Sequence, residues 1–396
     1  GAPTRGRLGR LRPVVLLAAS AAMLATKLPA ELLQHVASYV PAYHIKAAAP
    51  TCKALSIAAR NALNERPMLA VTSTTANSVV LLDIDGSRVK RWNAMPPDRI
   101  KTRFGLERSW VTGIACGEDM SLHVGQYSAH GLLTFALPPD VPRAARARSA
   151  YSYEQTIRTT PSPEGIVCAH GFVYSVGVTQ GHGSSLWRNT PARTLEEKPS
   201  LLVGTLWGIS LMPEKKGLFI AAHDDDDQEV EGPTIEDSGR ILAVRFSDEP
   251  AGSFKHGPER MPTALRDWDA AGLQMPPLNR PTDLACCGHG SLFVASFRGY
   301  AFDRERVIYK IALSEDRTMG GEVCCITLPD GYMACGLTCM RGDVLYATAH
   351  DGEIGSSNSA IFSFHCGCSD VGEHAEVPHP TKLTKVPGAH GITSVP

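Results

Sequence analysis

Short apolar segments alternate with turn residues over most of the chain, and one segment type recurs at intervals. Residues 112–115 read Thr-Gly-Ile-Ala, and versions of this signal return in four later places, at 164–167, 207–210, 282–285 and 335–338. Each copy is followed by two further apolar runs that have the length of β-strands. A repeat unit of this size cannot bury its hydrophobic faces alone, so copies must pack side by side.

A sixth copy is split between the two ends of the repeat region. Residues 389–393 hold the opening strand without a continuation, whereas residues 67–83 hold the later strands without an opening. A ring that pairs its first and last segments leaves no unpaired sheet edge at the join. The pattern therefore predicts a mainly β protein, a six-bladed β-propeller over residues 67–396 that the C-terminal strand closes.

The chain before the propeller has a helical period instead. Leu32, Leu33, Val36 and Val40 fall on one face of a helix, and a second apolar series follows Pro41. We therefore expect a small α-helical module at 28–66. Residues 1–27 precede it as a leading helix or a targeting segment, because several arginines come before a twelve-residue, mostly apolar run at 14–25. That run is too short to span a bilayer, which takes about 20 residues.

Residues 28–55, LPAELLQHVASYVPAYHIKAAAPTCKAL, resemble the F-box. The positions that match its pattern are Leu28, Pro29, Glu31, Leu32, Leu33, Val36, Tyr39, Val40, Pro41, Ile45, Cys52 and Lys53. The resemblance implies that the apolar face binds the Skp-type adaptor of a cullin-RING ubiquitin ligase. The implied contact residues are Leu28, Pro29, Leu32, Leu33, Val36 and Val40. The alternative is that this stripe packs on the protein's own propeller.

The repeat region resembles the NHL-repeat, streptogramin-lyase and gluconolactonase-like propellers. In such repeats the residue before the Gly-Ile signal and those after the second strand face the mouth of the central channel. The candidate residues there are Glu164, His223, Asp224, Arg298, His350, Asp351 and His390. A lactonase-type propeller would hold a divalent cation at this place, although the Asn ligands of that family do not appear here. The other interpretation is a mouth filled with hydrogen-bonded histidine and water, with no cofactor.

The amino-acid composition limits the kinds of partner that the protein can bind. Lys and Arg number 39 against 40 Asp and Glu, so the chain has no basic excess for binding nucleic acid. The 11 cysteines contain no CxxC pair, which argues against a zinc hook and favours a reduced compartment, cytoplasmic or nuclear. A cleaved N-terminal segment would instead place the protein in a secreted or organelle-lumen compartment.

Three functions are compatible with these patterns. The first is a non-enzymatic substrate receptor, in which the F-box-like module recruits the ligase and the propeller binds a protein substrate. The second is a secreted or organelle-targeted propeller hydrolase or lyase of the lactonase type. The third is a structural subunit of a larger assembly. Fold alone does not choose among them.

Overall fold

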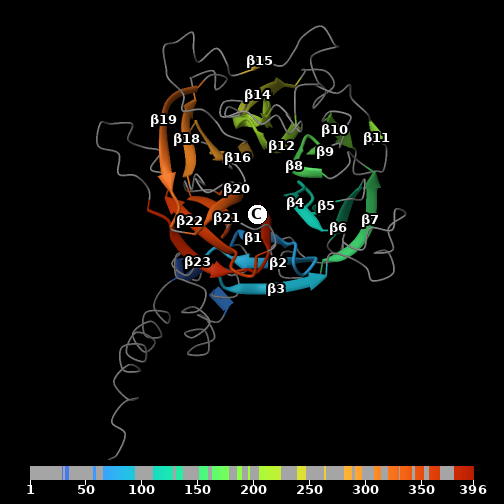
Figure 1. Cartoon of the computed structure of the whole chain (residues 1–396). Coiled ribbons are helices and arrows are strands. Elements are labelled where there is room, and N and C mark those ends of the chain that lie inside the picture. The colour runs from blue at the N-terminus through green and yellow to red at the C-terminus, as the bar shows by residue number, and fades with distance from the viewer. Residues whose placement is uncertain are drawn as a thin grey trace, which may run out of the picture.

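The computed structural model describes residues 29, 32–34, 57–58, 66–93, 110–127, 131–136, 151–158, 163–177, 185–189, 195–196, 205–223, 239–246, 263–264, 281–287, 290–296, 307–313, 320–329, 331–340, 344–351, 356–365 and 379–396. Within these ranges the chain forms six antiparallel sheets of four strands each. Figure 1 shows the sheets arranged around a common centre, where the C-terminus lies. The predicted six-bladed β-propeller is confirmed.

The closing blade joins the two ends of the repeat region. Its strands are β24 (Ala389–Val395), β1 (Met68–Ser73), β2 (Ser78–Asp83) and β3 (Arg88–Asn93), in that order from the centre outward. β24 lies antiparallel to β1, with Met68 opposite Val395 and Val71 opposite Ile392. This pairing is the closure that the split sixth copy predicted.

The other five blades follow in chain order. Blade 1 contains β4 (Val111–Cys116), β5 (Leu122–Gln126), β6 (Gly131–Ala136) and β7 (Ser152–Arg158). Blade 2 contains β8 (Pro163–Ala169), β9 (Phe172–Gly177), β10 (Ser185–Asn189) and β11 (Leu195–Glu196). Blade 3 contains β12 (Thr205–Leu211), β13 (Gly217–His223), β14 (Gly239–Arg245) and β15 (Thr263–Ala264), with a 3-10 turn, η3 (Pro213–Lys215), between its first two strands.

Blade 4 contains β16 (Pro281–Cys286), β17 (Ser291–Ser296), β18 (Val307–Leu313) and β19 (Gly320–Thr327). Blade 5 contains β20 (Met333–Met340), β21 (Val344–His350), β22 (Ala360–His365) and β23 (Thr381–Lys385). The inner strands β24, β4, β8, β12, β16 and β20 each contact the next one around the ring. The first strand of every repeat therefore lines the propeller axis.

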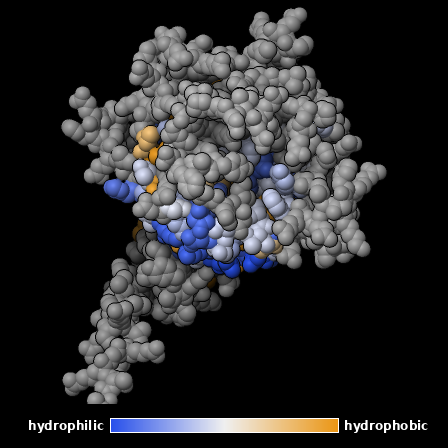
Figure 2. Space-filling model, viewed as in Figure 1, coloured by the Kyte–Doolittle hydropathy of each residue, from blue (hydrophilic) through white to orange (hydrophobic). Residues whose placement is uncertain are grey.

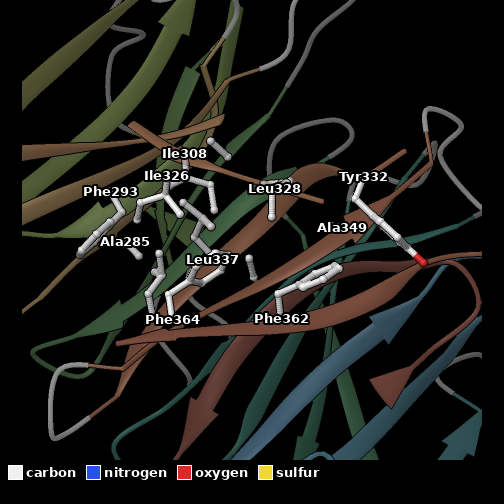
Figure 3. Close-up of a cluster of buried hydrophobic side chains, with 14 of the residues drawn as sticks. Ala285, Phe293, Ile308, Ile326, Leu328, Tyr332, Leu337, Ala349, Phe362 and Phe364 are labelled. Carbon is white, nitrogen blue, oxygen red and sulfur yellow. The ribbon is translucent and has the colours of Figure 1, made fainter. Parts of the chain in front are cut away.

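Apolar side chains between neighbouring blades form the core. Figure 3 shows one such cluster, in which Phe293 and Ile326 of blade 4 pack against Leu337, Phe362 and Phe364 of blade 5. These residues alternate with others along their strands, so each sheet presents an apolar face to its neighbour. Burying a side chain of this kind contributes roughly 1.5–3 kcal/mol.

Basic residues lie along two of the outermost strands. Arg88 and Arg91 on β3 and Lys382 and Lys385 on β23 are exposed, and Figure 2 shows hydrophilic surface over this part of the molecule. Charged side chains on an edge strand oppose pairing with another chain. The outer edge strands of these two blades are therefore protected against pairing with another chain. The inner strands do not carry this row of basic residues.

Glycine in the repeat signal is explained by the closeness of the inner strands. A Cβ atom added to Gly113 would lie 1.9 Å from the carbonyl oxygen of Glu164 in the next blade, and one on Gly391 would lie 2.6 Å from the oxygen of Thr112. No side chain fits at these distances, so the strands can meet only where this position is glycine. Blade 4 departs from the rule, since Asp283 stands at the equivalent position.

Little of the N-terminal module lies within the described residues. Residues 32–34 form a helical turn, in which the backbone N–H of Leu33 donates to the oxygen of Pro29 over 3.1 Å. Leu28, Val36, Val40 and the whole of 1–27 lie outside the described residues, so the predicted helical module stays a prediction. No helix in the described part of the chain is long and apolar enough to cross a membrane.

Candidate functional site

All six inner strands carry a pairing irregularity at the same point of the repeat. The register between first and second strand shifts by one residue there in every blade. Such a bulge leaves one residue unpaired and redirects its side chain. The residues at or beside the six bulges, all of which precede the glycine or its equivalent, are Thr112, Glu164, Trp207, Thr282, Cys335 and His390.

Two of these residues make contact across the axis. His390 Nε2 of the closing blade lies 3.1 Å from Glu164 Oε2 of blade 2, although β4 of blade 1 lies between β24 and β8 in the ring. Their side chains are 14% and 9% exposed, so the pair is shielded from water but not sealed. Both residues were candidates from the sequence, and the structure brings them together.

His390 is protonated at neutral pH in this setting. Burial alone would lower its pKa, but interaction with the side chains of Cys335 and Glu164 outweighs burial and raises the pKa to about 10. An imidazolium has two N–H donors. Nε2 donates to Glu164, whereas the buried Nδ1 has no hydrogen-bond partner among the described residues.

Asp283 adds a second carboxyl group at this level of the axis. Its Oδ2 accepts a 2.7 Å hydrogen bond from the backbone N–H of Leu337 in blade 5. Burial raises the pKa of Asp283 to about 7, against the opposing effects of backbone hydrogen bonds and of His390. The residue as a whole is partly exposed. Asp283 was not among the candidates from the sequence, and its substitution for the repeat glycine is the signal that identifies it.

Cys335 supports the backbone of His390. Its Sγ lies 3.2 Å from Thr348 Oγ1 and 3.7 Å from the carbonyl oxygen of His390. The Thr348 hydroxyl itself donates to that carbonyl oxygen. These contacts connect β20 and β21 to the start of β24. They fix the backbone position from which the imidazole of His390 extends. We call Glu164, Asp283, Cys335 and His390 the axial cluster.

The remaining candidates do not enlarge this cluster. His350 is buried at the end of β21, and hydrogen bonds from Ser356 and Asn358, next along the same hairpin, lower the pKa of Asp351. The backbone of His223 ends β13, opposite Thr205. The side chain of His223, together with Asp224 and Arg298, lies outside the described residues.

The cluster does not have the ligand arrangement of a metal site. Among the residues that the structure describes, no group of three or more His, Cys, Asp or Glu side chains is placed to hold a metal ion. His390 and Glu164 instead satisfy each other as an ion pair. The divalent cation that a lactonase-type resemblance implied therefore has no ligand set here, and we derive no step through a metal.

The fold and the axial cluster together define a six-bladed propeller with acid and base groups on its axis. No protein-family model matches the chain, and no curated protein matches it in sequence. Solved structures do match in fold. A PQQ-bound aldose sugar dehydrogenase from Streptomyces coelicolor is 13% identical, with 83% of this chain and 91% of that chain covered and a TM-score of 0.46.

Two other structures show the same kind of likeness. A gluconolactonase from Xanthomonas campestris is 11% identical, with 72% of this chain and 79% of that chain covered and a TM-score of 0.44. A virginiamycin B lyase from Staphylococcus aureus is 14% identical over 70% of each chain, with a TM-score of 0.34. At these identities the likeness concerns the fold alone, and the activities in those names belong to those proteins.

Proposed function

We propose that the propeller binds a small carbonyl compound on its axis and acts on it by acid–base chemistry, as a hydrolase or lyase of the lactonase type. The observation that carries this proposal is Asp283, a partly exposed residue whose carboxyl group has a pKa of about 7 and interacts electrostatically with His390, which is protonated at neutral pH. A general base works best when its pKa lies near the operating pH. Two ionisable groups with strongly shifted pKa values in one site are typical of functional sites.

The roles follow from the contacts. Glu164 holds the imidazolium of His390 through Nε2, which fixes its positive charge at the site. Asp283 accepts a proton from water as the water oxygen bonds to the carbonyl carbon, and the negative charge moves to the carbonyl oxygen, where the charge of the imidazolium stabilises it. Collapse re-forms the carbonyl, breaks the C–O bond of the lactone and returns the proton from Asp283 to the leaving alkoxide.

Asp283→Asn tests this assignment. With δ-valerolactone and dihydrocoumarin as substrates, we expect the wild-type rate to rise with pH through about 7, because the base acts when deprotonated. The variant should lose roughly 10²- to 10⁴-fold in kcat. Asp351→Asn is the control and should keep the wild-type rate, because the carboxyl group of Asp351 is hydrogen-bonded within its own hairpin. A wild-type protein that opens neither lactone, or a variant that keeps the full rate, would contradict the proposal.

A second candidate function rests on Leu32. Its side chain is 47% exposed although the next residue, Leu33, is 5% exposed. An apolar residue exposed beside a buried one is what an F-box-like helix leaves available for a Skp-type adaptor, with the propeller then selecting a protein substrate in the cytoplasm or nucleus. Such a receptor acts by raising the effective concentration of its substrate near the ligase.

Adaptor capture separates this candidate from the first. Leu32→Asp should abolish pull-down of a Skp-type adaptor by the full chain, since it places a charge in the centre of the apolar face. Ile57→Asp is the matched control, because Ile57 is 49% exposed but lies beyond the F-box-like residues. Equal pull-down by both variants would refute the F-box-like interface.

A further inference from the structure

Two aromatic rings lie where blade 1 meets the axis. Trp110 immediately precedes inner strand β4, and Tyr127 immediately follows β5. The backbone N–H of Tyr127 donates to the oxygen of Trp110 over 2.7 Å, which extends the β4–β5 pairing by one step. Their rings are stacked, with centroids 5.4 Å apart and planes 13° apart. Trp110 is 37% exposed, so part of this residue is accessible to a ligand.

Strand alternation turns this pair toward blade 2. Val111 and Val124 pack with the closing blade on one side of blade 1. Gly125 faces the opposite side, where a Cβ atom would lie 2.3 Å from the oxygen of Pro163 in blade 2. Trp110 alternates with Val111, and Tyr127 lies two residues after Gly125, so both rings are on the side of blade 1 that faces blade 2. Blade 2 is the blade that supplies Glu164.

The pair is also close to the axial cluster along the strand. Trp110 is two residues before Thr112, the bulge residue of blade 1, and two residues of a strand span about 7 Å. The side chain of Thr112 donates to the Pro163 oxygen of β8 over 2.6 Å. The bulge residue of blade 1 is thus engaged with the backbone of blade 2 and supplies no acid or base.

We propose that Trp110, stacked on Tyr127, is the specificity-determining subsite of the axial site and binds the planar ring of an aromatic lactone substrate. The proposal rests on the proposed hydrolase function for its substrate class. An accessible indole favours a flat, polarisable ring over an aliphatic one. Tyr127 fixes the orientation of the indole, so the subsite is preorganised and binding a ring costs little side-chain entropy.

Selectivity between two lactones tests the subsite. In the full chain, Trp110→Ala should lower kcat/KM for dihydrocoumarin by roughly tenfold and leave that for δ-valerolactone, which has no aromatic ring, unchanged. Trp110→Phe should restore most of the loss. An equal effect on both lactones, or none on either, would overturn the inference while leaving the proposed hydrolase function intact.

Binding without turnover separates the two proposals. Chroman is the ring system of dihydrocoumarin without its carbonyl, and saturation-transfer NMR reports its binding directly. We expect chroman to bind to the wild type and to Asp283→Asn but not to Trp110→Ala. If the wild type opens no lactone yet shows this pattern, the hydrolase function fails and the subsite stands. If chroman does not bind to the wild type, or binds equally to Trp110→Ala, the subsite fails.

Discussion

A chain that ends at Gly388 is expected not to form the closed propeller. The deletion removes β24, the inner strand of the closing blade and the partner of β1. Ile392 and Val395 are buried, and losing them alone removes roughly 3 to 6 kcal/mol. The Thr72 side chain also loses the backbone N–H of Gly391, which donates to it over 2.8 Å. A domain has only about 5–15 kcal/mol of stability, so this loss removes a large share of it.

Circular dichroism and urea unfolding of the full chain and the truncated chain measure the effect. Deleting only Pro396, which is exposed and follows β24, is the control and should leave the unfolding midpoint unchanged. A chain ending at Gly388 that unfolds cooperatively at the wild-type midpoint would show that the C-terminal strand does not close the ring.

The second large effect is expected when the pH is raised. The pKa of His390 is about 10 in the folded chain and has an ordinary value of 6.5 when unfolded. Its pair with Glu164 therefore contributes fully below pH 6.5, and the contribution is lost as the pH rises toward 10. The pKa of Asp283, raised from 3.8 to about 7, acts in the same direction between those values, because the folded state holds the proton longer.

Between pH 7 and pH 8 His390 dominates the slope, because this window lies above the pKa of Asp283 and below the ordinary pKa values of unfolded cysteines and tyrosines. The free energy of unfolding, from urea titrations, should fall across this window in the wild type and stay nearly level in His390→Gln. His123→Gln is the control. Burial lowers the pKa of His123 to about 4, so this histidine loses stability only toward acid and its removal should leave the alkaline slope intact. Equal slopes in all three proteins would argue against a protonated His390.

The architecture was predictable because one sequence signal is repeated and each copy packs against its neighbours in the same way. The glycine of that signal is needed where inner strands approach too closely for a Cβ atom, as at Gly113 and Gly391. The closure of the ring was predictable for the same reason, because the two halves of the sixth copy carry the same repeated signal. Glu164 and His390 were predictable as axis residues because they occupy equivalent positions before that glycine, although the sequence gives no sign that they touch.

Asp283 could not be selected in the same way, and the contact of Cys335 with His390 could not be predicted although Cys335 occupies the equivalent position before the glycine. Asp283 departs from the repeat glycine in one blade, and a single departure looks like ordinary variation until the neighbouring strands are in place. Its high pKa comes from burial among residues of other blades. Cys335 acts on His390 only because β20 and β24 are adjacent. The aromatic stack of Trp110 and Tyr127 likewise depends on the β4–β5 pairing.

The protonation state of His390 tests the central claim most directly. NMR titration of protein labelled with ¹³C at histidine Cε1, with His390→Gln to assign the signal, gives its pKa in the folded chain. Our account predicts that the imidazole of His390 remains protonated at pH 8, titrates near 10, and titrates lower in Glu164→Gln. A midpoint at or below 6.5, unchanged by Glu164→Gln, would contradict the axial acid–base site.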